Sequence, residues 1–257
     1  MAEAVLVECR GLAVGYNGRP ALRDVTFNAD TGERIGVLGP NGGGKTTLFR
    51  ALGGELEPMS GDVKVLSRCA TVPQTERSRL DYPVSALDVT LMGTIPLRGW
   101  WRHPRRSERA SAREALAAVG LDGLESRTFG ELSGGQRQRV LVARALVQDA
   151  SRVLLLDEPF SGMDVASAQR LSELIDRLAG EGRAVLVATH DVEQARRWDR
   201  VLCLNRRQIA FGPPDEVLTM QVLEATHGGT IVELQEDGEH VAVMPAHHHH
   251  EGGGGHA

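Results

Sequence analysis

A glycine-rich segment, GPNGGGKTT at residues 39–47, constrains this chain more than any other feature. It follows the apolar stretch Arg34–Leu38 and leads into Thr46–Leu52, which has a helical pattern, so the expected order is strand, glycine loop and helix. Glycines let several backbone N–H groups turn toward one polyphosphate, and the start of the helix adds partial positive charge. The segment therefore predicts a phosphate-binding loop.

The loop matches the pattern G-x-x-x-x-G-K-[ST], in which the lysine contacts the β and γ phosphates and the hydroxyl binds Mg²⁺. Here Lys45 and Thr46 take these two places. The expected nucleotide contacts are Gly39, Asn41, Gly42, Gly43, Gly44, Lys45, Thr46 and Thr47. The alternative is a flexible glycine-rich turn. The chain has only one other lysine, Lys64, which makes a lysine in this loop informative.

A second motif, RVLLLDEP at residues 152–159, is an apolar strand that ends in two acids. A carboxylate at the end of a buried strand is costly unless it meets a cation, so we expect Asp157 to bind Mg²⁺ beside the loop. Glu158 would then face the γ-phosphate and polarise the attacking water. The alternative is a strand followed by an acidic turn that Pro159 closes, and the phosphate loop favours the catalytic interpretation.

The remaining pattern alternates strands with helices. Strands are expected at 5–9, 25–28, 34–38, 153–156 and 184–189, and helices at 46–52, 107–119, 135–147, 167–179 and 192–198. This alternation implies an α/β fold with a mainly parallel sheet covered on both faces. Residues 5–37 predict a small antiparallel sheet before it, 75–150 an inserted helical subdomain, and 230–244 two short strands around a polar turn.

A third motif, LSGGQ at residues 132–136, opens a helix with a Ser-Gly-Gly start that suits phosphate oxygens; a plain helix cap is the alternative. Here the sequence resembles the ATP-binding cassette (ABC) ATPase family, whose hallmark is this segment between the phosphate loop and the acid-ended strand. The resemblance covers most of residues 5–225. Its motif residues occur in the family's order: Lys45, Gln74, Ser133, Asp157, Glu158, Asp164 and His190.

The resemblance implies a P-loop NTPase fold with an N-terminal antiparallel β subdomain and an inserted helical subdomain. The implied units are a RecA-like nucleotide-binding core with the β subdomain (1–74 and 151–210), the helical subdomain (75–150), a C-terminal extension (211–246) and a disordered tail (247–257). By the same resemblance, Tyr16 stacks on adenine, Gln74 senses Mg²⁺ and the attacking water, and His190 contacts the γ-phosphate. For Tyr16 the alternative is a half-buried strand-end tyrosine, and for His190 a structural histidine.

The resemblance also implies partners. Two copies face each other as a homodimer, and Ser133, Gly134, Gly135 and Gln136 of one copy complete the ATP site of the other. Asp164 lines their interface, although Gly162-Met163 stand where the family often has Ala-Leu. The pair would drive an integral-membrane permease from the cytoplasmic face of the membrane, and a substrate-binding receptor would act indirectly. The implied ligands are ATP and Mg²⁺.

Two segments indicate a particular branch of the ABC ATPase family: residues 72–93, and residues 158–164, in which Phe160 follows Glu-Pro. Both segments are similar to those of ATPases of zinc, manganese and ferrous-iron importers. The alternatives are ATPases of iron-chelate or cobalamin importers, of an exporter, or a soluble ABC ATPase that acts on ribosomes or DNA. A module that holds ATP without turnover is a further alternative, against which Lys45, Asp157, Glu158 and His190 count.

Composition and charge argue against several classes of protein and leave the role of the histidine-rich C-terminal segment open. The net charge of −5 and pI of 6.0 give no case for nucleic-acid binding, no apolar run is long enough to span a bilayer, and we expect no secretory signal. Three widely spaced cysteines fit reduced thiols. Residues 208–257 hold no Lys or Arg, eight acids and seven of nine histidines. The histidines of 247–256 are expected either to bind Zn²⁺ weakly or to form a solvated tail.

Overall fold

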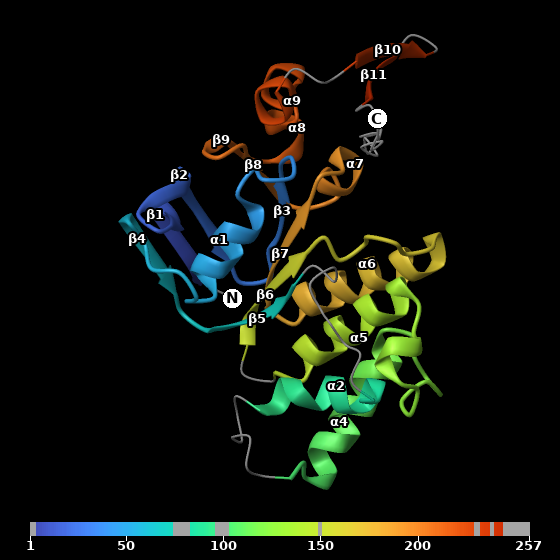
Figure 1. Ribbon diagram of the computed structural model, residues 1–257. Coiled ribbons are helices and arrows are strands. Elements are labelled where there is room, and N and C mark those ends of the chain that lie inside the picture. The colour runs from blue at the N-terminus through green and yellow to red at the C-terminus, as the bar shows by residue number, and fades with distance from the viewer. Residues whose placement is uncertain are drawn as a thin grey trace, which may run out of the picture.

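A six-stranded sheet in the order β5-β6-β7-β3-β8-β9 forms the centre of the protein (Figure 1). The computed structural model describes residues 4–73, 83–95, 103–148, 151–228, 232–236 and 239–243. The strands of this sheet are β3 (Arg34–Leu38), β5 (Arg68–Val72), β6 (Ser151–Asp157), β7 (Ala184–Thr189), β8 (Arg200–Leu204) and β9 (Gln208–Gly212). Neighbouring strands from β5 to β8 are parallel, and β9 is antiparallel to β8. The glycine loop after β3 and the two acids at the end of β6 therefore open on the same edge of the sheet.

Strand β6 shows why its sequence is apolar without interruption. Val153 and Leu155 belong to the core cluster that includes the antiparallel sheet, whereas Leu154 and Leu156 belong to the cluster that includes the helical segment. Successive side chains of a strand point to opposite faces, and both faces of β6 are covered. The predicted α/β fold with a mainly parallel, doubly covered sheet is confirmed.

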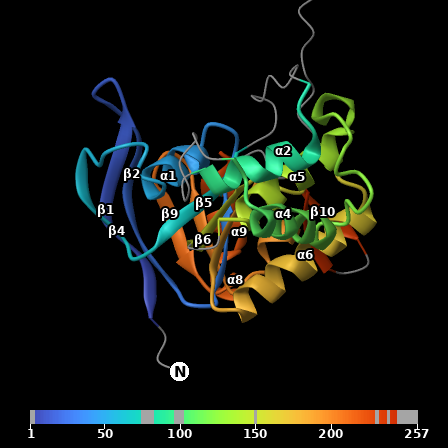
Figure 2. The same ribbon diagram turned by 90° about the horizontal axis from the view of Figure 1, so that it is seen from below.

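Helices cover the sheet on both faces. They are α1 (Lys45–Leu52), α2 (Ala86–Leu91), α4 (Arg106–Ala118), α5 (Gly134–Leu146), α6 (Val165–Gly180), α7 (Val192–Ala195), α8 (Pro214–Val217) and α9 (Met220–His227), with 3-10 turns η2 (Met92–Thr94) and η3 (Phe129–Glu131). Helix α1 packs in the same cluster as the antiparallel sheet, and α2, α4, α5 and α6 share the other. Figure 2 shows the antiparallel sheet and these helices on opposite sides of the molecule. No helix among the described residues is long and apolar enough to cross a membrane.

The antiparallel sheet has the order β2-β1-β4, with β1 at Val5–Tyr16, β2 at Arg19–Asp30 and β4 at Ser60–Val65. Its first two strands are longer than the sequence predicts, because shifts of register let the pairing continue past a strict alternation of side chains. Asn17 and Gly18 join them with positive φ angles of 51° and 73°. Tyr16 therefore lies at the end of β1, beside a tight turn.

The C-terminal part of the core adds β8, β9, α8 and α9, which bury Val201, Cys203, Val217 and Leu223 together. The two strands predicted within 230–244 are present as the antiparallel pair β10 (Val232–Glu236) and β11 (Glu239–Val243). Residues 247–257, for which the sequence predicts a disordered tail, lie outside the described residues.

Candidate functional site

The glycine loop fits its place because several of its positions lack a side chain, as Gly39 and Gly44 show. A Cβ atom on Gly39 would lie 2.3 Å from the carbonyl oxygen of Leu204 in the neighbouring strand β8. Gly44, just before α1, has a φ of 104°, which L side chains rarely adopt, and a Cβ there would meet the Leu22 side chain at 2.9 Å. Glycine at these two positions therefore lets the loop approach β8 and the Leu22 side chain of β2 closely.

Lys45 begins α1 and is 6% exposed. Its Nζ donates hydrogen bonds to the carbonyl oxygens of Gly39 (2.6 Å) and Pro40 (3.3 Å) and lies 3.2 Å from Glu158 Oε1. A buried ammonium group needs such partners. The structure thus brings the predicted phosphate-contacting lysine and the predicted water-polarising acid into direct contact.

Thr46 and Asp157 meet across 111 residues of sequence: the Thr46 hydroxyl donates to Asp157 Oδ2 at 2.7 Å. Asp157 is 3% exposed at the end of β6. A buried carboxylate and a hydroxyl oxygen at the start of a phosphate-binding helix are hard oxygen donors of the kind that Mg²⁺ takes alongside phosphates and water. The residues present fit this ion.

Glu158 follows β6 with a φ of 49°, an unusual backbone conformation for a residue other than glycine. Its Oε2 lies 3.0 Å from His190 Nδ1, which follows β7. Burial opposes the charge of the Glu158 carboxylate, yet the His190 hydrogen bond and the Lys45 ammonium outweigh burial and lower the pKa of Glu158. The same hydrogen bond raises the pKa of His190. The pair thus favours a carboxylate and an imidazolium.

A cavity of about 520 Å³ extends from Lys45, Asp157 and Glu158 to Tyr16. Its lining includes Tyr16, Asn41, Gly42, Gly44, Lys45, Thr46, Thr47, Arg50, Glu55, Asp157 and Glu158. Tyr16 is 40% exposed, and its hydroxyl accepts a hydrogen bond from Arg50 Nη1 at 3.2 Å. No sequence motif singles out Arg50. Its spacing of three residues from Thr47 on α1 was the available signal, since such residues share one face of a helix.

The LSGGQ segment lies elsewhere. Among the described residues that line this cavity, none comes from 133–136. Ser133 instead caps α5, where its hydroxyl accepts from the Gln136 backbone N–H at 3.2 Å and its own N–H donates to Gln136 Oε1 at 2.9 Å. Gly135 packs against the backbone of Gly162, and Asp164 caps α6. Gln74 lies outside the described residues.

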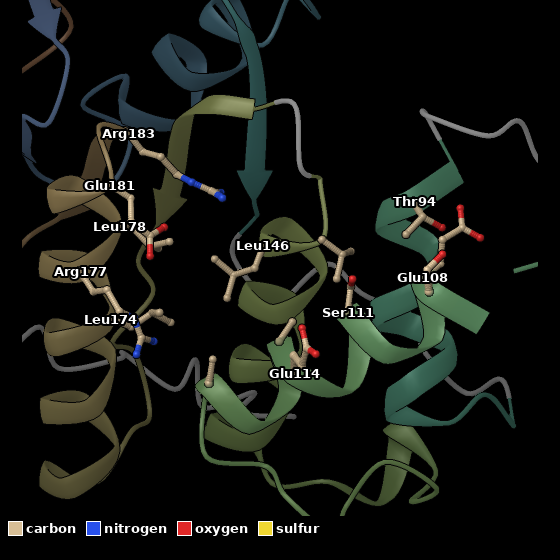
Figure 3. Close-up of a pocket in the computed structure, with 14 residues that line it drawn as sticks. Thr94, Glu108, Ser111, Glu114, Leu146, Leu174, Arg177, Leu178, Glu181 and Arg183 are labelled. Atoms are coloured by element: carbon tan, nitrogen blue, oxygen red, sulfur yellow. The ribbon is translucent and has the colours of Figure 1, made fainter. Parts of the chain in front are cut away.

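A second cavity, of about 510 Å³, lies between α4, the end of α5 and α6 (Figure 3). Glu114 of α4 and Arg177 of α6 line opposite walls, and Leu146 lies between them. None of the predicted site residues is among its described lining. The described part of the chain also holds no cluster of three or more His, Cys, Asp or Glu side chains placed to bind a metal.

The parallel sheet, the glycine loop and the acid-ended strand beside it define a nucleotide-binding protein of the phosphate-loop class. The chain belongs to the ABC transporter family, whose model matches residues 22–161.

Curated relatives cover most of the chain. It is 37% identical over 239 residues to the manganese transport system ATP-binding protein MntB of Bacillus subtilis, covering 90% of this chain and 95% of that protein. It is 41% identical over 239 residues to the zinc transport system ATP-binding protein TroB of Treponema pallidum, covering 90% of each. It is 37% identical to the chelated iron transport system protein YfeB of Yersinia pestis, covering 86% of this chain and 78% of that protein.

Solved structures match in fold. An ABC transporter in an inward-facing conformation matches with a TM-score of 0.80 and 29% identity, covering 93% of this chain and 97% of that chain. The dimeric cassette MJ0796 in a post-hydrolysis state, bound to ADP and phosphate, matches with a TM-score of 0.71 and 25% identity, covering 81% and 98%. The fold predicted from the sequence, an ABC ATPase with its antiparallel β subdomain, is confirmed.

Proposed function

We propose that this protein is the ATP-hydrolysing subunit of an ABC transporter that imports a divalent metal ion, with manganese, zinc and iron as the candidate cargoes. The observation that carries the ATPase assignment is the contact of Glu158 with Lys45 and His190 beside the Thr46–Asp157 pair. One cavity is lined by Lys45, Thr46, Asp157 and Glu158. Few arrangements other than phosphoryl transfer to water use these groups together.

In this proposal the triphosphate of ATP lies over the glycine loop, and its base extends toward Tyr16. Lys45 exchanges its contacts with Gly39, Pro40 and Glu158 for oxygens of the β and γ phosphates. Thr46, Asp157 and Gln74 would hold Mg²⁺, which would neutralise phosphate charge.

Glu158, once released from Lys45, accepts a hydrogen bond from the attacking water. The hydrogen bond with His190, the first cause that lowers the pKa of Glu158, remains and favours the ionised form that this task needs. His190 keeps the carboxylate oriented and contacts the γ-phosphate. General-base assistance of this kind contributes about 10²–10⁴-fold to a rate.

A second copy of the chain completes the site. ABC cassettes dimerise, and the structure places Ser133–Gln136 at the start of α5, away from the cavity of its own chain. The Ser133 hydroxyl accepts a hydrogen bond in its cap and still has its own proton to donate. We propose that it donates to the γ-phosphate bound by the partner copy.

The cargo assignment rests on similarity to MntB and TroB over about nine tenths of the chain. The protein would act at the cytoplasmic face of the membrane on a permease that a metal-binding receptor supplies. A second candidate is the import of chelated iron, which similarity to YfeB favours.

Subunit complementation tests the shared ATP site. Lys45→Ala inactivates the phosphate loop and Ser133→Ala inactivates the segment that the partner contributes, so each variant alone should lack ATPase activity. Mixed dimers have one intact site, and an equal mixture should recover up to about a quarter of the wild-type rate if dimers form at random and sites act independently. No recovery, with dimers demonstrated, would refute a site shared between copies.

A further inference from the structure

Arg50 contacts Tyr16 in two ways. Its Nη1 donates a hydrogen bond to the Tyr16 hydroxyl at 3.2 Å, and its guanidinium carbon lies 5.4 Å from the centroid of the ring, within the range of a cation–π interaction. Thr47 Oγ1, on the same face of α1, lies 3.5 Å from the same hydroxyl. Two side chains of α1, Arg50 and Thr47, therefore converge on one exposed aromatic side chain.

Arg50 is itself fixed. Its Nε donates to Glu55 Oε2 at 3.0 Å, and the pKa of Arg50 is raised by that hydrogen bond first and by the contact with Tyr16 second. The neighbouring residues Leu48 and Phe49 are fully buried, so α1 is anchored in the core. The guanidinium thus extends from a rigid element.

Tyr16 lacks such an anchor of its own. It ends β1 next to the two-residue turn of Asn17 and Gly18, and 40% of its surface is exposed. Without the contact to Arg50, only the 3.5 Å contact of its hydroxyl with Thr47 Oγ1 would restrain the rotamer of its ring. The arginine ties this end of the hairpin to the helix that begins with Lys45.

We propose that Arg50 is a positioning residue for the nucleotide base. It holds the Tyr16 ring at a fixed distance from the phosphate loop, so that the base stacks on a platform already in place and little conformational freedom is lost on binding. This inference rests on the proposed function, because it requires that the cavity bind a nucleotide with its base at Tyr16. It predicts that Arg50 matters for ligands with a base and not for phosphates alone.

Calorimetric titration of the full chain with MgADP and with magnesium pyrophosphate separates these two ligands, and neither is turned over. We expect Arg50→Met to weaken MgADP binding about three- to tenfold and to leave pyrophosphate binding unchanged. Arg10→Met is the matched control, because Arg10 pairs with Glu8 on the surface of β1, away from the cavity. It should change neither affinity.

A double-mutant cycle tests whether Arg50 acts through the ring. In a Tyr16→Ala background, Arg50→Met should have no further effect on MgADP binding. In ATP hydrolysis, Arg50→Met should raise KM by a similar factor and leave kcat unchanged, a split that general loss of folded protein does not produce. Glu55→Gln, which loosens the anchor and keeps the arginine, should shift MgADP binding in the same direction by less.

Several results would overturn the inference. Equal weakening of MgADP and pyrophosphate would make Arg50 a phosphate-site charge, and an equal effect with and without Tyr16 would remove the ring from its action. Unchanged MgADP binding in folded Arg50→Met would refute positioning while the proposed function stands. Failure of the wild-type protein to bind MgADP would refute both.

Discussion

Replacing Glu158 by glutamine removes the proposed base with little change in the shape of the side chain. Glu158 is 8% exposed, with one oxygen 3.2 Å from Lys45 Nζ and the other 3.0 Å from His190 Nδ1. An amide keeps a hydrogen-bonding group in this place but cannot accept a proton from water. We therefore expect ATP hydrolysis to fall by about 10²–10⁴-fold in Glu158→Gln.

Nucleotide binding should survive this change. The neutral amide competes less with phosphate for Lys45, and it removes the repulsion between two negative groups that ATP binding otherwise creates. Glu158→Gln should therefore bind MgATP at least as well as the wild type and accumulate as a closed dimer, which size-exclusion chromatography with MgATP detects. A variant that had merely lost its fold would do neither.

His190 gives an independent readout in the same variant. Its pKa is raised chiefly by the hydrogen bond with the Glu158 carboxylate, so loss of that charge should return the pKa toward the ordinary value of 6.5. Titration of the histidine ring protons by NMR measures this shift.

The assay is phosphate release under single-turnover conditions, with Glu193→Gln as the control. Glu193 is an exposed acid on α7 whose nearest cation, Arg196, lies at 3.8 Å, so its removal should leave the rate unchanged. Undiminished turnover in Glu158→Gln would remove Glu158 from the role of base and refute the reasoning from the Lys45–Glu158–His190 contact.

Three further predictions concern stability, pH and the tail. In Gly39→Ala the new Cβ would lie 2.3 Å from the Leu204 carbonyl oxygen, which should lower the free energy of unfolding by about 1–3 kcal/mol. Gly180→Ala is the control, because a Cβ there would meet no neighbouring group within 4 Å and should cost nothing. Equal melting temperatures of the two variants would contradict this. The pKa of His190 is raised in the folded protein, so its stabilising effect is complete below pH 6.5 and is lost as pH rises through the folded-state pKa. His190→Ala should therefore lower Tm at about pH 6 and much less at about pH 9. A Tm difference independent of pH would argue against the ion pair. Deletion of 247–257 should abolish weak Zn²⁺ binding and leave ATPase activity intact, and calorimetry that finds the same Zn²⁺ binding in both proteins would refute a role for the histidines.

Local sequence patterns predicted the elements that carry the site. The loop at 39–47 and the strand at 153–156 were recognisable because a buried parallel strand is apolar on both faces and a phosphate loop needs glycines. Strand β4, SGDVKV, was not predicted, since its exposed and half-exposed residues include glycine and charges. The short strands β8 and β9 were also missed, because a brief apolar run does not distinguish strand from helix.

Long-range contacts within the site were beyond local patterns. The order of motifs predicted that Lys45, Asp157, Glu158 and His190 act together, but it did not predict that Lys45 and Glu158 pair directly across 113 positions. Nor did it indicate Arg50, because the pairing of β1 with β2 and the packing of α1 on β1 decide which side chain of the helix meets Tyr16. Spacing alone puts Arg50 on the same helix face as Thr47, and packing decides that this face meets Tyr16.

The central claim is that ATP hydrolysis by this protein drives uptake of a divalent metal ion. The most direct measurement is the elemental content of manganese, zinc and iron in source cells that lack the protein, complemented with the wild type or with Glu158→Gln. We expect the content of one metal to fall under limitation and only the wild type to restore it. Unchanged contents of all three metals would contradict divalent-metal import, while restoration by Glu158→Gln would contradict its dependence on hydrolysis.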